Sequence, residues 1–229
     1  MNKNKSAIKW YRKWWGILII IFSIFLLAFI LSFALAVRNR VKEIRAEQNV
    51  KIRQDYLERL APKDSPRQGS VTPALTIVEF ADFDCPYCAK TLPTIERILA
   101  EYGGLVQYVY RYMPIAELHP ESWSASLAAT CANEQGMFWQ YHDKLFSEQD
   151  NFTKENLFTW AKELGLKMDD FTNCYDSEEY GWQVRRDMSD GADIEIEGTP
   201  TFFLNGERLS GALSYDKWKI LLDALLMNK

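Results

Sequence analysis

The stretch LTIVEFADFDCPYC, residues 75–88, decides the fold. Leu75–Phe80 is a short run rich in β-branched and aromatic residues, which predicts a buried strand. Cys85-Pro86-Tyr87-Cys88 follows almost at once, and the residues from there to about Tyr102 have the pattern of a helix. Pro86 suits an early helical position because its missing N–H needs no partner there. We therefore expect a strand, a short loop and a helix that begins at the cysteines.

A Cys-x-x-Cys pair occurs as a redox pair, as half of a zinc site or as a structural disulfide. Cys85 is predicted to lie at the helix N-terminus. Free backbone N–H groups and the helix dipole stabilise a thiolate there and lower the thiol pKa below about 8.5. Because only a thiolate attacks a disulfide, Cys85 is the predicted nucleophile. Cys88, one helical turn later, is the predicted resolving thiol, which releases a mixed disulfide.

The zinc alternative needs two further ligands. The remaining cysteines and histidines are isolated from one another and lack the short spacings typical of zinc ligands: Cys131, Cys174, His119 and His142. We expect no metal, and we interpret both histidines as surface or structurally satisfied residues in helices.

The segments after the first helix predict a mixed α/β domain. Gly103-Gly104 ends that helix, and Leu105–Tyr112 alternates as a second strand does. Residues 117 to about 194 have a helical pattern with short polar breaks. Then follow the strand Thr201–Leu204, the hairpin turn Asn205-Gly206, the return strand Glu207–Ser210, and a helix from Ser214 to near Met227.

The N-terminal part predicts a membrane span. Residues 16–37 read GILIIIFSIFLLAFILSFALAV, without a charge or a proline. As a helix this run is about 33 Å long, enough to cross a hydrocarbon core of roughly 30 Å. A soluble core helix would normally have a polar face, and here the polar residues are only Ser23 and Ser32. We predict a single transmembrane helix over 16–37.

The flanks of this span suggest its orientation. The basic residues of segment 1–15 have no acidic residue among them, whereas those after the span are diluted by Glu43 and Glu47. The positive-inside rule favours a cytoplasmic N-terminus and an extracytoplasmic C-terminal part, in the periplasm or at the cell surface. A cleaved signal peptide is the alternative, because Ala34-Leu35-Ala36 has the spacing of a cleavage site. The length of the apolar run favours an uncleaved anchor.

Composition divides the rest of the chain. Residues 38–70 predict a helical stalk that ends in a Pro-, Gly- and Ser-rich linker, followed by a folded domain over 71–229. Residues 1–60 carry 12 Lys and Arg against 4 Asp and Glu, a net of +8, so the whole-chain net charge of −4 leaves −12 for residues 61–229. A basic stem suits an anionic membrane surface. An acidic domain argues against a nucleic-acid partner, since phosphate binding needs a basic face.

Two motifs occur together in this chain, Asp82-Phe83-Asp84-Cys85-Pro86-Tyr87-Cys88 and Gly198-Thr199-Pro200-Thr201. With the long helical insert of about 117–194 between them, they resemble the DsbA-like thiol:disulfide oxidoreductases of the thioredoxin superfamily. The resemblance covers approximately Val71 to the C-terminus. It implies an α/β, thioredoxin-like fold with a helical insertion behind the transmembrane helix. It also implies a redox-active disulfide and no other cofactor.

The resemblance assigns further residues to substrate binding. Pro200 would be a cis-proline that faces the active-site disulfide, with Thr199 beside the sulfurs. These two residues, together with Pro86 and Tyr87, would contact a substrate polypeptide.

The resemblance also assigns a buried acid and a second disulfide. Glu79 would lie under the active site and take the proton of Cys88 during exchange, with its pKa raised by burial. Cys131 and Cys174, both in the insert, resemble the pair that forms a structural disulfide in some members of the family.

The implied activity is that of an oxidase that donates the Cys85–Cys88 disulfide to unfolded or exported proteins with thiols. Its implied redox partner is a quinone-linked membrane oxidase. The direction of electron flow depends on the reduction potential, so a disulfide reductase or isomerase of the same fold is an alternative. An alternative of another class is a non-catalytic, anchored thioredoxin-like binding module, although such a module would not need both cysteines and Pro200.

Overall fold

The computed structural model describes residues 7–227 and divides the chain into two compact units, Met1–Asp55 and Tyr56–Lys229. The helix α1 spans Ala7–Leu60. Its residues 7–55 are the described part of the first unit, and its last residues belong to the second unit. Among the described residues, one helix is long and apolar enough to cross a membrane, and it is α1. The large apolar side chains of residues 17–37 are exposed, as in a segment that faces lipid. Residues 1–6 of the predicted basic segment 1–15 lie outside the described residues.

The second unit is built on a five-stranded mixed sheet with the order β1-β3-β2-β4-β5. The strands β2 (Leu75–Ala81) and β3 (Val106–Tyr112) run parallel, and α2 (Pro86–Tyr102) connects them. The other neighbours are antiparallel: β1 (Arg67–Gly69) beside β3, β4 (Thr201–Leu204) beside β2, and β5 (Glu207–Ser210) beside β4. The β4–β5 hairpin turns at Asn205 and Gly206, whose φ angles of 50° and 90° are those of a type I′ turn.

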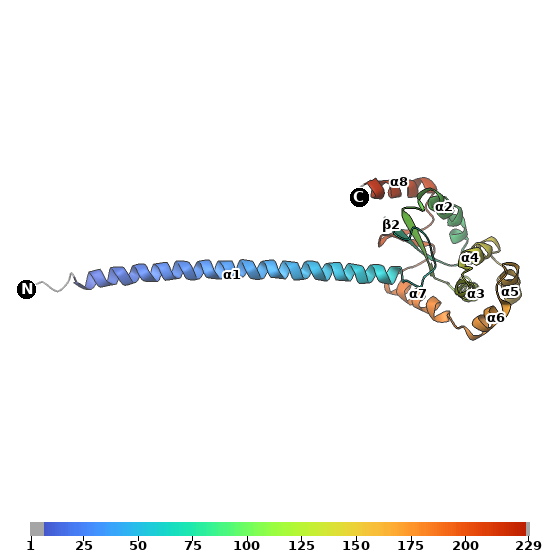
Figure 1. The fold of residues 1–229 in the computed structure, drawn as a ribbon, viewed down its shortest axis with the longest axis horizontal. Helices are drawn as coiled ribbons and strands as arrows, with labels where there is room; N and C mark the ends of the chain where they lie inside the picture. Colours follow the sequence, from blue (N-terminus) through green and yellow to red (C-terminus); the bar gives the residue numbers. More distant parts are fainter. Residues whose placement is uncertain (1–6, 228–229) are drawn as a thin grey trace, which may run out of the picture. The chain divides into compact units, whose positions relative to one another are not determined.

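Side chains of β2 alternate between the two faces of the sheet. On one face, Leu75 and Ile77 pack with α2 and α8 (Tyr215–Met227), which lie side by side (Figure 1). On the other face, Val78 and Phe80 pack with the last turn of α1 and with residues that follow α7. The sheet is therefore covered on both faces, which explains why β2 reads as a nearly continuous apolar run.

Five helices form the insert between β3 and β4: α3 (Ser122–Glu134), α4 (Phe138–Ser147), α5 (Lys154–Glu163), α6 (Met168–Ser177) and α7 (Gly181–Asp193). The buried helix α3 packs against the other four. The insert shares one apolar core with Ala81, Phe83 and the two cysteines of the Cys-x-x-Cys pair. It is therefore packed directly against the segment that carries Cys85 and Cys88.

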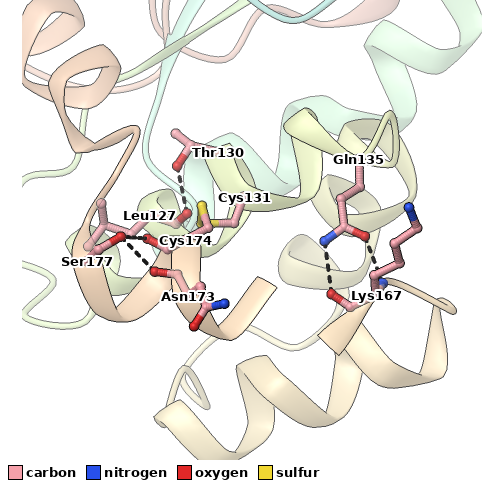
Figure 2. The surroundings of a disulfide bond; sticks show 8 residues. All are labelled: Leu127, Thr130, Cys131, Gln135, Lys167, Asn173, Cys174 and Ser177. Atoms are coloured by element: carbon pink, nitrogen blue, oxygen red, sulfur yellow. Dashed lines mark hydrogen bonds between the residues drawn. A yellow bond between two sulfur atoms is a disulfide. The ribbon is translucent and has the colours of Figure 1, made fainter. Parts of the chain in front are cut away.

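A disulfide joins two helices of the insert. Cys131 of α3 and Cys174 of α6 are bonded, with their Cα atoms 5.8 Å apart, and both are buried (Figure 2). The same helices are linked at their ends. The Gln135 side chain accepts from the backbone N–H of Lys167 at 2.7 Å and donates to its carbonyl oxygen at 3.2 Å. These are the two cysteines for which the family resemblance implies a structural disulfide.

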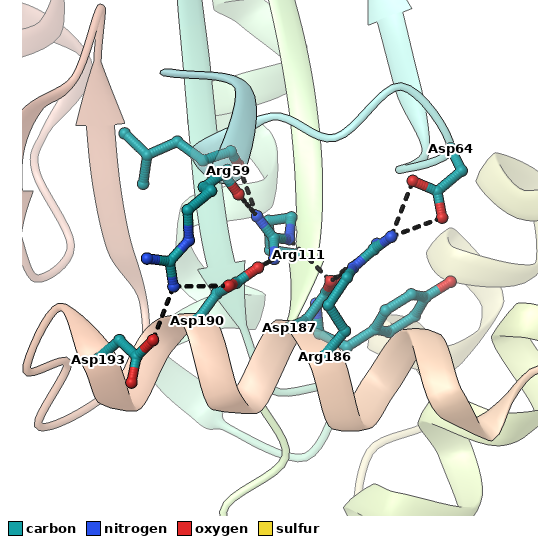
Figure 3. A network of polar contacts seen from close by, with 9 residues as sticks. Arg59, Asp64, Arg111, Arg186, Asp187, Asp190 and Asp193 are labelled. Atoms are coloured by element: carbon teal, nitrogen blue, oxygen red, sulfur yellow. Dashed lines mark hydrogen bonds and ion pairs between the residues drawn. The ribbon is translucent and has the colours of Figure 1, made fainter. Parts of the chain in front are cut away.

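A buried arginine connects the sheet, α7 and the end of α1. The guanidinium of Arg111, on β3, pairs with Asp187 at 2.9 Å and with Asp190 at 2.6 Å (Figure 3). It also donates to the carbonyl oxygens of Arg59, at 2.5 Å, and Leu60, at 2.8 Å. Because Arg111 has no exposed surface, its charge is tolerated only through these partners.

The folded unit thus begins earlier than the sequence predicts. A stalk and linker were expected over 38–70, but the second unit starts at Tyr56. The strand β1 pairs with β3 through Arg67 and Val109, and Asp64 pairs with Arg186 at 2.7 Å. A three-residue edge strand is too short to show a period-two pattern, so composition alone indicated a linker.

Candidate active site

The loop between β2 and α2 brings Cys85 to the N-terminus of α2. Cys85 is the N-cap residue, with φ −80° and ψ 118°, and the proline after it opens the helix. Its carbonyl oxygen accepts the backbone N–H groups of Cys88, at 3.0 Å, and Ala89, at 3.2 Å. Both cysteines are free thiols. Both residues are buried, Cys85 with 4% and Cys88 with 1% of its surface exposed.

The surroundings of Cys85 stabilise its thiolate. A hydrogen bond with Cys88 is the largest effect and lowers the pKa of Cys85, whereas burial raises it. The Thr199 side chain and the backbone N–H groups of Cys88 and Tyr87 lower it further, so that the pKa of Cys85 is about 5. N–H groups at a helix N-terminus carry the positive end of the helix dipole. At neutral pH Cys85 is therefore ionised, which is the form that attacks a disulfide.

Cys88 has the opposite protonation behaviour. Burial, followed by the neighbouring Cys85 and Glu79, raises the pKa of Cys88 well above its ordinary value. Glu79, on β2, is 3% exposed. Burial raises the pKa of Glu79 to about 7, although hydrogen bonds from Tyr108 and Thr91 lower it. The Thr91 hydroxyl lies 3.4 Å from Oε1 of Glu79 and 2.8 Å from the carbonyl oxygen of Cys88. A carboxyl group that titrates near neutral pH thus lies beside the predicted resolving thiol.

The peptide bond between Thr199 and Pro200 is cis. The Cys85 Sγ lies 3.4 Å from the carbonyl oxygen of Thr199. The Thr199 hydroxyl is buried and has no hydrogen-bond partner of its own among the described residues, which leaves it free to donate to the Cys85 thiolate. A cleft of about 360 Å³ opens beside this bond, lined by residues 195–201 and by Arg208, Ser210 and Gly211.

The other two predicted substrate contacts lie at the surface. Pro86 and Tyr87 are both exposed, and Tyr87 shows 60% of its surface. The Lys90 ammonium lies 5.3 Å from the centre of the Tyr87 ring. Exposed apolar and aromatic groups next to a reactive sulfur are available for contact with a bound polypeptide.

Two residues to which the sequence analysis assigned no role at the site, His119 and Gln149, reach the Cys85 loop from distant positions. His119 Nδ1 lies 2.8 Å from Asp82 Oδ2. Gln149, between α4 and α5, donates to the carbonyl oxygens of Phe83, at 2.7 Å, and Cys85, at 3.0 Å. No local pattern connects these residues to the motif. The sequence analysis placed His119 in a helix, but it lies in the loop before α3.

The zinc alternative would require a cluster of ligand side chains in the part of the chain that the structure describes. No group of three or more His, Cys, Asp or Glu side chains there is arranged to hold a metal ion. The second histidine, His142, is buried in α4, with its Nδ1 2.8 Å from Asp143. The arrangement suited to chemistry is an ionised sulfur, a protonated sulfur one turn later, and a carboxyl group beside it. The two thiols can carry out thiol–disulfide exchange, and the carboxyl group can serve as a proton acceptor.

Comparison with known proteins identifies the family. A family model described as Thioredoxin matches residues 62–224. Because the match covers most of the chain, the chain belongs to the thioredoxin family.

Several solved structures share this architecture. BdbD from Bacillus subtilis is 26% identical, with a TM-score of 0.63 over 72% of this chain and 94% of that chain. The thiol-disulfide exchange protein alpha-DsbA2 from Wolbachia pipientis is 21% identical, with a TM-score of 0.68 over 79% of this chain and 98% of that chain. The predicted thioredoxin-like fold with a helical insertion is confirmed. The chain is thus a thioredoxin-family protein with the fold of these structures, and its N-terminal helix is long and apolar enough to anchor it in a membrane.

Curated relatives match over only part of their length. A protein named Na(+)/H(+) antiporter NhaA 3 from Salinispora tropica is 36% identical over 159 residues, which are 68% of this chain and 24% of that protein. The chain spans about a quarter of the length of such relatives. The similarity therefore concerns a segment of those larger proteins.

Proposed function

We propose that this chain is an oxidase that donates the Cys85–Cys88 disulfide to thiol-containing proteins outside the cytoplasm. A substrate thiolate attacks the Cys85 sulfur, the Cys85–Cys88 bond breaks, and a mixed disulfide forms. A second substrate thiolate then attacks the substrate sulfur of that mixed disulfide and releases Cys85. The substrate loses two electrons and two protons. The Cys85–Cys88 pair gains both electrons and one proton, on Cys88, and the other proton goes to solvent because Cys85 stays ionised at neutral pH.

The observation that carries this proposal is the position of Cys85 at the N-terminus of α2, where its thiolate is stabilised. Its pKa of about 5 lies two units below neutral pH, which favours the reduced form by about 2.7 kcal/mol at pH 7. For a two-electron couple this raises the reduction potential by about 60 mV, relative to a pair whose thiols stay protonated. Stabilising the reduced form makes the disulfide a better oxidant. The raised pKa of Cys88 does not oppose this effect, because Cys88 is protonated at pH 7 either way.

A cycle of oxidation needs a partner that restores the disulfide. We propose a quinone-linked oxidase of the same membrane, which would accept two electrons from the reduced pair. The N-terminal helix is apolar and long enough to hold the chain in that membrane. An N-terminus in the cytoplasm would leave the thioredoxin-like unit outside it, where unfolded exported proteins are the substrates.

The reduction potential of the full-length protein in detergent tests the direction of electron flow. Equilibration with glutathione buffers, followed by alkylation and mass measurement, gives the ratio of disulfide to dithiol. We expect a potential more positive than about −200 mV. We also expect the oxidised protein to form the disulfide of a reduced, unfolded substrate, and the Cys85→Ala variant to be inactive. Cys131 and Cys174 are already bonded to each other. The peptides that contain them should therefore remain unalkylated, which serves as the internal control.

Other outcomes would support the alternatives. A potential near −270 mV, with rapid reduction of insulin, would indicate a disulfide reductase. Repair of a scrambled substrate without net oxidation would indicate an isomerase. If neither the wild type nor Cys85→Ala had any thiol–disulfide exchange activity, the chain would be a non-catalytic binding module.

A further inference from the structure

Asp82 anchors the turn that precedes Cys85. It follows β2 directly and is fully buried. Its carboxylate accepts the backbone N–H groups of Asp84 and Ile115, each at 2.9 Å. Its carbonyl oxygen accepts the N–H of Cys85 at 3.1 Å. The position of this one residue therefore fixes where α2 starts and where the Cys85 sulfur lies.

A buried carboxylate is costly unless an opposite charge compensates it. Among the described residues, the ion-pair partner of Asp82 is His119, with Nδ1 2.8 Å from Oδ2. The His119 side chain is 19% exposed, and its Nε2 has no hydrogen-bond partner in the described part of the chain. His119 can therefore exchange a proton with water while it stays paired with Asp82.

The charged groups that act most strongly on His119 belong to the segment that leads to Cys85. Burial lowers the pKa of His119, but the hydrogen bond and charge of Asp82, and the charges of Cys85 and Asp84, together raise it above its usual value. The interaction with Cys85 is reciprocal: if the thiolate favours the imidazolium, the imidazolium favours the thiolate equally. Loss of the His119 proton would leave the Asp82 charge uncompensated near the reactive sulfur.

We infer that His119, paired with Asp82, is a positioning residue for Cys85, and that its protonation controls the reactivity of the Cys85 sulfur. This inference deepens the proposed function, because it makes disulfide donation depend on the pH outside the cytoplasm. His119 does not touch the substrate sulfur in this scheme. It acts through the charge of Asp82 and through the turn that Asp82 holds.

The pH profile of Cys85 alkylation tests the inference. The reduced full-length protein in detergent is treated with iodoacetamide between pH 4 and pH 9. His119→Gln keeps a hydrogen-bonding side chain but no titratable charge. At pH 6 we expect its alkylation rate to be about threefold to tenfold below that of wild type, because the thiolate then forms at higher pH. Lys217→Gln, which removes an exposed positive charge on α8, is the matched control and should follow the wild type.

A second substitution separates charge compensation from structural support. Asp82→Asn in the His119→Gln background removes the uncompensated carboxylate, so the alkylation rate at pH 6 should return toward that of wild type. If the pair were merely structural, the double variant would be no more reactive than His119→Gln. That result, or equal profiles for His119→Gln and wild type, would overturn the inference.

The unmodified protein provides an independent measurement. NMR titration of the His119 ring should give a lower pKa when Cys85 and Cys88 are oxidised than when they are reduced, because oxidation removes the thiolate. Equal values in both redox states would contradict the inference. A different result would contradict the proposed function itself: titration of the wild-type Cys85 thiol like that of free cysteine.

Discussion

At the level of single residues, Glu79 shows how burial prepares a proton acceptor. It lies on the α2 face of β2, beneath the first turns of the helix, and no cation pairs with it in the described residues. Burial therefore dominates and raises its pKa to about 7. A carboxyl group with this pKa is partly ionised at neutral pH and can take the proton of Cys88 when that thiol attacks a mixed disulfide.

We predict that Glu79→Gln slows the attack by Cys88 about a hundredfold at pH 8, because general base catalysis is lost. The attack on oxidised glutathione by Cys85 should change much less. Stopped-flow measurement of the Cys85–glutathione mixed disulfide separates the two steps. Glu207→Gln changes an exposed strand glutamate and serves as the control. Equal lifetimes of the mixed disulfide in wild type and Glu79→Gln would argue against a role for Glu79.

The same substitution should change the pH dependence of stability. The pKa of Glu79 is raised from 4.5 to about 7 on folding, so the folded protein holds this proton more tightly. The contribution of Glu79 to stability is therefore lost as the pH rises from about 4.5 through 7. Relative to wild type, Glu79→Gln should gain up to about 3 kcal/mol between pH 4.5 and pH 8. Denaturant unfolding at several pH values checks this. A difference that does not vary with pH would contradict it.

The site was predictable where its chemistry is local. Cys85 and Cys88 stand out because a strand, a loop and a helix start lie within a few residues of them. Pro200 and Glu79 needed the family resemblance, since nothing near them in sequence specifies a partner. His119 and Gln149 could not be found, because their contacts with Asp82, Phe83 and Cys85 exist only once the insert folds back onto the loop.

At the level of elements, the Cys131–Cys174 disulfide closes a loop with a sequence separation of 43 residues. In the chain-entropy model this loop length corresponds to about 4 kcal/mol of stabilisation. We predict that the double variant Cys131→Ala, Cys174→Ala loses about 2–4 kcal/mol of unfolding free energy in the full-length protein. Chemical denaturation followed by tryptophan fluorescence measures the loss. A change below about 1 kcal/mol would mean that helix packing alone holds α3 against α6.

Most element boundaries followed from hydrophobic pattern and turn residues. The strands β2 to β5 and the helix α2 begin and end within a residue or two of the predicted positions. The strand β1 was missed because its place in the sheet depends on pairing with β3, which no local pattern encodes. Arg111 gave no signal either, since its partners on α1 and α7 are far away in sequence.

At the level of the whole molecule, the orientation in the membrane is open to a direct test. We predict that a membrane-impermeant maleimide labels Ser214→Cys in intact spheroplasts, because this exposed residue would lie outside the cytoplasm. Ser6→Cys should be labelled only after the membrane is permeabilised. Both variants carry Cys85→Ala and Cys88→Ala, so that the new thiol is the one detected. The reverse labelling pattern would place the thioredoxin-like unit in the cytoplasm.

The bonds from Arg111 to Arg59 and Leu60 have a consequence for the fate of the chain in the cell. Proteolytic shedding after Ala36 would leave every partner of that guanidinium in place, since these residues lie well downstream. An anchored enzyme and a secreted one would then carry the same catalytic machinery, differing only in how far they can diffuse. Cutting a few residues beyond Leu60 would instead strip two acceptors from a buried cation, and the released fragment would be the less stable product.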